Sequence, residues 1–142
     1  MKYSAFTKET SSAFILKCRR SGLIEDRYAY CVPECLVRDN EFRDLSFPSK
    51  MAMSVLLQKM AAGNLSADHE GTVYLRFSAE LLAQEMRIPV VLAEKCLREL
   101  KRKGLILNDD WETGRIAVAD ISNLMMRKYG RTEETDYECQ QV

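Results

Sequence analysis

The stretch SAELLAQEMRIPVVLAEKCLRELKRKGLIL, residues 78–107, decides the fold of this 142-residue chain. Ser78 is a typical helix-capping residue, and apolar residues follow it at helical spacing until Ile88 and Pro89 interrupt the pattern. Pro89 suits the start of a second helix because it has no N–H to lose there, and Gly104 suits its end. Two helices joined by such a short turn pack at a steep angle, which holds the second one outward. Residues 78–103 therefore predict a helix-turn-helix.

Strands are predicted on both sides of this helix pair. Apolar and polar residues alternate in TVYLRF, residues 72–77, which favours a strand before the first helix. After Gly104, residues 105–107 favour a strand, 109–114 a tight tip and 115–119 a returning strand. Strand, helix, turn, helix, strand, tip and strand is the winged-helix pattern. The predicted fold class is α+β, mainly helical, with a winged helix-turn-helix and an N-terminal helical extension.

Further elements are predicted outside this core pattern. They are a helix over 5–22, a short strand over 28–32, a turn or single helical turn over 33–37, a long helix from Ser46 to Gly63 and a last helix over 122–129. The residues beyond Gly130 are polar and acidic, so we expect disorder there. This organisation predicts three parts: an N-terminal helical extension (1–27), a winged-helix domain (28–129) and a flexible acidic tail (130–142).

The helix expected over 89–103 has one apolar and one basic side. Leu92, Cys96 and Leu100 mark the side that packs inward, with Ala93 and Leu97 beside them. The major groove of B-DNA admits one helix, and Lys and Arg can neutralise phosphates or pair with guanine there. The predicted outward face holds Val90, Val91, Glu94, Lys95, Arg98, Lys101 and Arg102. The candidate DNA-binding residues are Arg76, Ser78, Arg87, Val90, Val91, Lys95, Arg98, Arg102 and Arg115.

An ordinary surface helix is the alternative interpretation of this face. Glu94 with Arg98, and Glu99 with Lys103, are spaced as ion pairs that stabilise any exposed helix. Val90 and Val91 also stand where a reading helix usually presents polar groups. They could contact thymine methyls, a second copy of the chain or a protein partner.

The charge of the chain is local rather than global. The formal net charge is zero, yet residues 76–103 carry seven Lys or Arg against four acids, and residues 1–30 carry six against three. Residues 131–142 carry one against four. An acidic end therefore hides basic regions in the total, and the position of charge matters more for a DNA footprint than the sum.

The cysteines and the histidine give little sign of chemistry. Five cysteines with no C-x-x-C pair favour free thiols in a reducing cytoplasm over disulfides or a zinc site. His69 is the only histidine and lies in an acidic loop, and the sequence has no glycine-rich phosphate loop. We expect no catalytic residue, cofactor or bound metal, and no membrane segment. Trp111 is expected to pack against its neighbours.

Several segments together resemble the N-terminal domain of the replication initiator A family, which initiates replication of plasmids and related mobile elements. YAYCVPECLV (28–37) resembles the opening segment of the family, and FRDLS (42–46) its step into the first long helix at 50–60. DHEGTVYLRFS (68–78) resembles its loop, strand and cap, while LREL (97–100) and GLI (104–106) resemble the end of its recognition helix. Residues 82–106 also resemble transcription regulators of the catabolite-activator type.

The resemblance implies a DNA-binding initiator-type domain that binds origin repeats as a homodimer. Its implied partners are double-stranded DNA and a second copy, with host replication proteins engaged by a second domain of the family that has no counterpart in these residues. Two alternatives stay open: a winged-helix transcription regulator, and a winged helix that binds protein instead of DNA. Val90, Val91 and the acidic tip at 108–112 favour the last of these.

Overall fold

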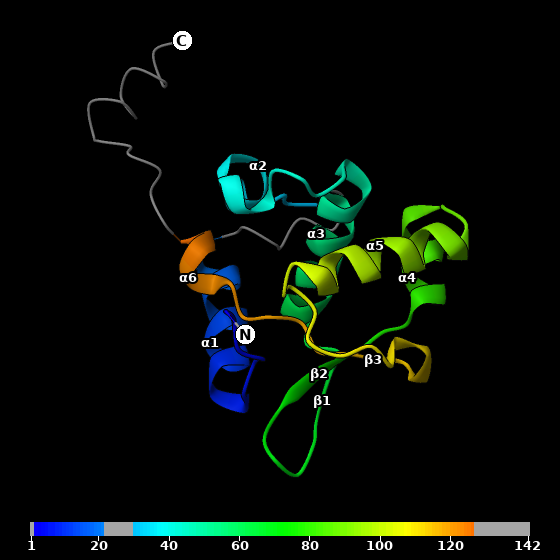
Figure 1. Cartoon of the computed structure of the whole chain (residues 1–142). Coiled ribbons are helices and arrows are strands. Elements are labelled where there is room, and N and C mark those ends of the chain that lie inside the picture. Colours follow the sequence, from blue (N-terminus) through cyan, green and yellow to red (C-terminus); the bar gives the residue numbers. More distant parts are fainter. Residues whose placement is uncertain (1, 22–29, 127–142) are drawn as a thin grey trace, which may run out of the picture.

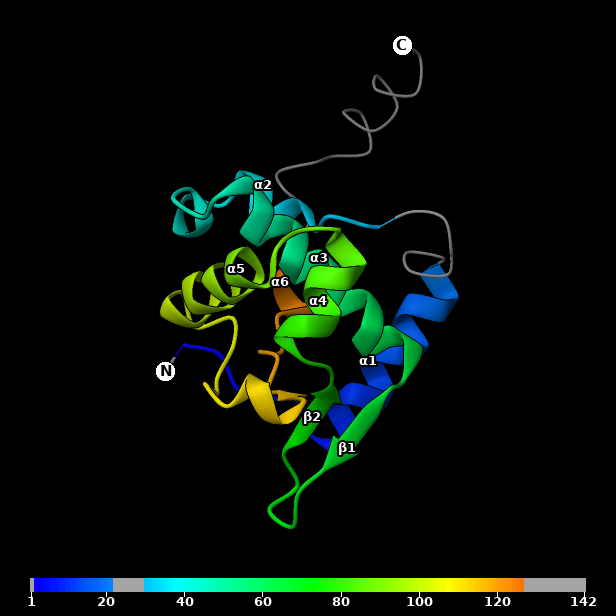
Figure 2. The ribbon, with the colours of Figure 1, turned by 90° about the vertical axis from the view of Figure 1, so that its right-hand side faces the viewer.

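The computed structural model describes residues 2–21 and 30–126, and helix α3 (Phe47–Ala62) lies at its centre (Figures 1 and 2). The Ser46 hydroxyl accepts a hydrogen bond from the Ser49 N–H (3.3 Å) and so caps the start of the helix, and Gly63 ends it in a left-handed conformation. Apolar side chains surround most of α3, so α1, α4, α5 and β2 all pack against it. The predicted long helix is confirmed.

The helix-turn-helix forms as predicted from α4 (Ala79–Met86) and α5 (Val90–Arg102). The Ser78 hydroxyl accepts a hydrogen bond from the Leu81 N–H (3.2 Å) and caps α4. Arg87 ends α4 with a positive φ of 55°, and Pro89 stands immediately before α5. The turn therefore reverses the chain within three residues, and α5 packs on both α4 and α3.

A three-stranded antiparallel sheet lies below the helices in Figure 1, in the order β1, β2, β3. Its strands are β1 (Leu65–Ala67), β2 (Val73–Arg76) and β3 (Arg115–Ile116), and Leu75 stands opposite both Leu65 and Ile116. The strand over 72–77 is confirmed, but β1 was not predicted.

The predicted wing is present in a reduced form. The strand expected over 105–107 is wrong: this segment makes only an isolated bridge between Ile106 and Val118. The returning strand is shorter than the predicted 115–119 and is limited to β3. The tip is a 3-10 helix, η2 (Trp111–Thr113), and not a loose turn. The winged-helix fold class is nevertheless confirmed.

The N-terminal residues belong to the same core as the winged helix. Helix α1 (Lys8–Ser21) packs on α3 and buries Phe14 and Cys18, while Phe6 is fully buried just before it. The Val73 N–H donates to the Phe6 carbonyl, and the Asp120 N–H donates to the Ser4 carbonyl (both 2.8 Å). The first residues thus bind between β2 and the segment after β3. The division at 27/28 and 129/130 stays a prediction, because those residues lie outside the described ranges.

Short elements complete the described chain. Helix α2 (Glu34–Arg38) confirms the predicted single helical turn, and the 3-10 helix η1 (Asn40–Phe42) and α6 (Ser122–Met125) follow in the chain order. The strand predicted over 28–32 is wrong for 30–32, which form no strand, and its first two residues lie outside the described ranges. The rest of the last predicted helix and the tail also lie outside them. None of the described helices is long and apolar enough to cross a membrane.

Candidate nucleic-acid interface

Four exposed residues form one line along the outer side of α5, which we call the reading stripe: Val91, Lys95, Arg98 and Arg102. Steps of four, three and four residues keep them on one face of a helix. The opposite face, made of Ala93, Cys96, Leu97 and Leu100, is buried against α3 and α4. The predicted inward and outward faces are therefore confirmed, with Leu92 half-buried at their border.

The last turns of α5 are tied to the start of α3 by two polar contacts. Glu99 accepts hydrogen bonds from the Ser46 N–H (2.5 Å) and the Ser46 hydroxyl (3.3 Å). Lys103 lies 2.5 Å from the Asp44 carboxylate, and this hydrogen bond lowers the pKa of Asp44. The Glu99–Lys103 pair expected from their spacing is therefore wrong. These contacts fix how α5 is rotated on α3, and so where the reading stripe points.

The cations of α5 meet acids on two sides. Arg98 lies 3.9 Å from Glu94 on the same helix, as expected from the spacing, and both side chains remain partly exposed. Lys101 lies 3.0 Å from Asp109 of the wing, and this contact lowers the pKa of the Asp109 carboxyl. The acidic wing thus neutralises the cation at the edge of the stripe and leaves the stripe itself basic.

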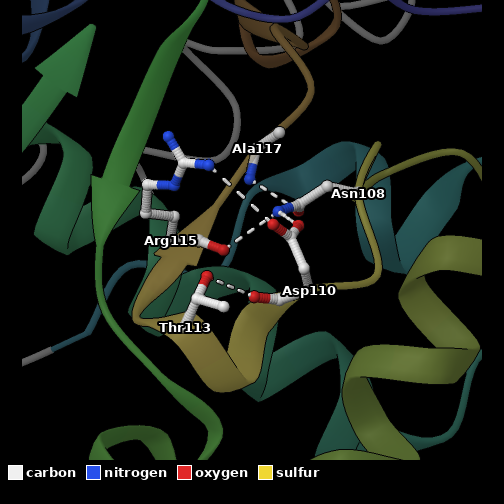
Figure 3. A network of polar contacts seen from close by, with 5 residues as sticks. All are labelled: Asn108, Asp110, Thr113, Arg115 and Ala117. Atoms are coloured by element: carbon white, nitrogen blue, oxygen red, sulfur yellow. Dashed lines mark hydrogen bonds and ion pairs between the residues drawn. The ribbon is translucent and has the colours of Figure 1, made fainter. Parts of the chain in front are cut away.

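A network of polar contacts closes the wing, as Figure 3 shows. The Asn108 amide donates to the Asp110 carboxylate (2.5 Å) and to the Arg115 carbonyl (3.0 Å), while its oxygen accepts from the Ala117 N–H (2.9 Å). The Thr113 hydroxyl donates to the Asp110 carbonyl (2.7 Å). Arg115 also lies 3.9 Å from the Asp110 carboxylate. One asparagine therefore bridges both sides of the tip and makes the wing short.

A shallow hollow of about 490 Å³ lies between α5 and the wing. Arg98, Lys101 and Arg102 line it from the helix, and Asp109 and Trp111 line it from the wing. Trp111 is only 6% exposed, which confirms that it packs against its neighbours. Sequence reasoning did not place Asp109 or Trp111 beside α5. The only signal for this contact was that Lys101 follows Arg98 by three residues, on the edge of the same face.

The remaining predicted DNA-binding residues lie in two further places. Arg76 and Arg115 stand opposite each other on β2 and β3, and the Arg115 guanidinium lies 4.8 Å from the centre of the Tyr74 ring. Ser78 and Arg87 are at the two ends of α4, and the Ser78 hydroxyl is used to cap that helix. The nine predicted residues thus form the stripe with Val90 beside it, a pair on the sheet and the two ends of α4.

A pair of contacts positions α4 behind α5. Glu85 on α4 lies 3.2 Å from Lys59 of α3 and accepts a hydrogen bond from the Tyr30 hydroxyl (2.5 Å). Burial, and then the bond to Glu85, raises the pKa of Tyr30 to about 12, while the same bond lowers the pKa of Glu85. These contacts hold the segment before α2 against the helix-turn-helix.

Comparison with solved structures gives the same fold. A structure titled "Structure of MDR initiator" is 17% identical, covers 97% of both chains and has a TM-score of 0.50. "Structure of Rep-DNA complex" is 16% identical over 88% of this chain and 90% of that one, with a TM-score of 0.49. "N-Terminal domain of DNA binding protein" is 16% identical over 99% and 95%, also with a TM-score of 0.49. No curated protein sequence matches significantly.

Comparison with protein families gives one match. The family described as "Replication initiator protein A (RepA) N-terminus" matches residues 28–136, which agrees with the segments that carried the resemblance. The match includes the helix-turn-helix, the sheet and the wing, and it begins after α1. Because the matched residues make up most of the sequence, the chain belongs to the replication initiator protein A family and is a replication-initiator domain of the N-terminal type.

Proposed function

We propose that the chain binds double-stranded DNA at the repeats of a replication origin, and that the reading stripe of α5 enters the major groove. The single observation that carries this proposal is the stripe itself. Three cations stand in one line on an exposed helix face, and the opposite face is buried and tied to α3. The major groove is about 12 Å wide and takes one helix, so such a face can reach base edges and phosphates together.

Each part of the interface has a role in this proposal. Arg98 and Arg102 neutralise phosphates or pair with guanine through two hydrogen bonds, and Lys95 contacts the groove one turn earlier. Arg76 and Arg115 on the sheet contact the neighbouring backbone, as wing residues do in this class of fold. Ser78 and Arg87 bring the ends of α4 to the backbone, since the first helix of such a pair crosses it.

We also propose that two copies act together on the origin. One α5 spans only a few base pairs, and two linked reading helices multiply weak single contacts. Host replication proteins are further partners in this proposal, and the cytoplasm is its place of action. The described cysteines, Cys18, Cys31, Cys35 and Cys96, are free thiols, which suits a reducing compartment.

The proposed role is binding without a catalytic step. His69, the only histidine, lies exposed in the loop between β1 and β2. Within residues 2–21 and 30–126, no three His, Cys, Asp or Glu side chains gather as metal ligands. A protein-binding winged helix is the second candidate, and the exposure of Val91 (75%) beside an acidic wing favours it. The two candidates differ in their dependence on salt.

The test measures the affinity for duplex DNA over a range of salt concentrations. We expect log affinity to fall linearly with log salt, by about 0.9 per phosphate contact. The double variant Arg98→Ala/Arg102→Ala should bind more weakly and show a slope smaller by about 2. Sedimentation of the complex gives the number of copies bound.

A matched control removes two arginines elsewhere. Arg19 and Arg20 are exposed on α1, which lies across α3 from α5 in both views (Figures 1 and 2). Arg19→Ala/Arg20→Ala should keep the slope of the unchanged chain. If no duplex is bound at low salt, or if the two double variants lose the same slope, α5 is not the reading helix.

A further inference from the structure

The first turn of α5 carries only aliphatic side chains. Val90, Val91, Leu92 and Ala93 follow Pro89 directly, and no side chain caps the start of the helix. Val91 is 75% exposed and Val90 is 40% exposed, while Ala93 is buried. Side-chain hydrogen bonds to base edges are therefore impossible at this end of the helix, where a reading helix normally makes its base contacts.

The surroundings of these valines fit DNA better than an apolar protein surface. Val91 is the first member of the reading stripe, one turn before Lys95, and Arg98 and Arg102 continue the same line. An apolar partner would have to cover these cations and remove them from water without pairing them, which is unfavourable. A polyanion with apolar groups set between its charges matches the whole stripe. In the major groove, the apolar group on the base edges is the C5-methyl of thymine.

We propose that Val91, with Val90 beside it, contacts thymine methyl groups, so that the repeats bound by this chain carry thymine under the first turn of α5. This inference rests on the proposed entry of α5 into the major groove. It assigns the two ends of one helix to different chemistry: the first turn selects thymine by contact with its methyl group, and the later turns bind phosphates and guanine through cations. Burying one methyl group favours binding by roughly fourfold.

The test compares thymine with deoxyuridine, which lacks only the methyl group. Duplexes are first selected by the unchanged chain from a random-sequence pool, and each thymine is then replaced in turn by deoxyuridine. For the unchanged chain, we expect roughly fourfold weaker binding at one or two positions. Val91→Ala should bind the thymine duplex more weakly and no longer distinguish it from the deoxyuridine duplex at one of these positions. The exposure of Val91 makes this variant harmless to the fold.

Two controls separate the outcomes. Leu16→Ala shortens an exposed aliphatic side chain on α1 and should keep the full preference for thymine. If binding is salt-dependent but no replacement weakens it, or if Val91→Ala still distinguishes the two duplexes, the thymine contact is wrong and the proposed function stands. Val91 then serves another surface, such as a protein partner. If no duplex is retained from the pool at low salt, both proposals are wrong.

Discussion

Removal of the Glu99 carboxylate should destabilise the domain although this residue lies on its surface. Glu99 accepts hydrogen bonds from the Ser46 N–H at 2.5 Å and from the Ser46 hydroxyl at 3.3 Å, and Ser46 is the capping residue of α3. Hydrogen bonds to a charged group contribute about 1.5–3 kcal/mol, and a negative charge at a helix start contributes about 0.3–1 kcal/mol. Water can replace the carboxylate at this exposed site, which favours the lower end.

We therefore expect Glu99→Ala to lower the free energy of unfolding by about 1.5 kcal/mol, which corresponds to a fall in Tm of about 5 °C for a domain of this size. Glu99→Gln keeps an acceptor but loses the charge, so its effect should be intermediate. Urea and thermal unfolding followed by circular dichroism measure both values. Glu94→Ala is the matched control, because Glu94 meets only Arg98 at 3.9 Å among the described ion pairs.

The control should lose no more than about 0.5 kcal/mol, as exposed helical pairs do. If Glu99→Ala costs no more than Glu94→Ala, the contact between α5 and the start of α3 does not stabilise the fold. The argument that it fixes the direction of the reading stripe would then fail as well.

Two further predictions concern the wing and the segment before α2. Trp111→Ala should destabilise the domain by about 3 kcal/mol in urea unfolding, because the ring is 6% exposed, whereas Trp111→Phe should cost clearly less; equal stability of all three chains would contradict the packing. Burial and the bond to Glu85 raise the pKa of Tyr30 to about 12, above its ordinary value near 10, so folding opposes loss of the phenol proton. Stability should therefore fall as the pH rises from about 10 to about 12, and the fall should be less steep in Tyr30→Phe; identical pH profiles would exclude this contribution.

Local patterns predicted the helix-turn-helix because its signals are local. Ser78, Pro89 and the spacing of the apolar residues act within one or two turns, and the same spacing predicted the reading stripe. Strand β1 was missed because residues 65–67 have no alternating pattern. Its structure depends on pairing with β2 and on the Asn64 side chain, which donates to the Arg76 carbonyl (2.9 Å).

Contacts between distant residues could not be read from spacing. Glu99 and Lys103 are four residues apart and could pair on the helix, but Ser46 and Asp44 offer them a helix start and a carboxylate from a different element. The wing was predicted as a longer hairpin because its apolar residues suit strands. Asn108 instead bridges the tip and shortens it, and the wing then places Trp111 beside α5.

The place of the N-terminal segment sets the order in which the domain can fold. Synthesis makes Phe6 first, yet its neighbours Val73 and Ala119 follow much later in the chain, and the Ser4 carbonyl binds the Asp120 N–H. Contacts between such distant residues close a long loop, and a high contact order slows folding. The nascent chain must therefore keep its first aromatic residue without its final partners until almost the whole winged helix has left the ribosome, and docking of the first residues completes the fold.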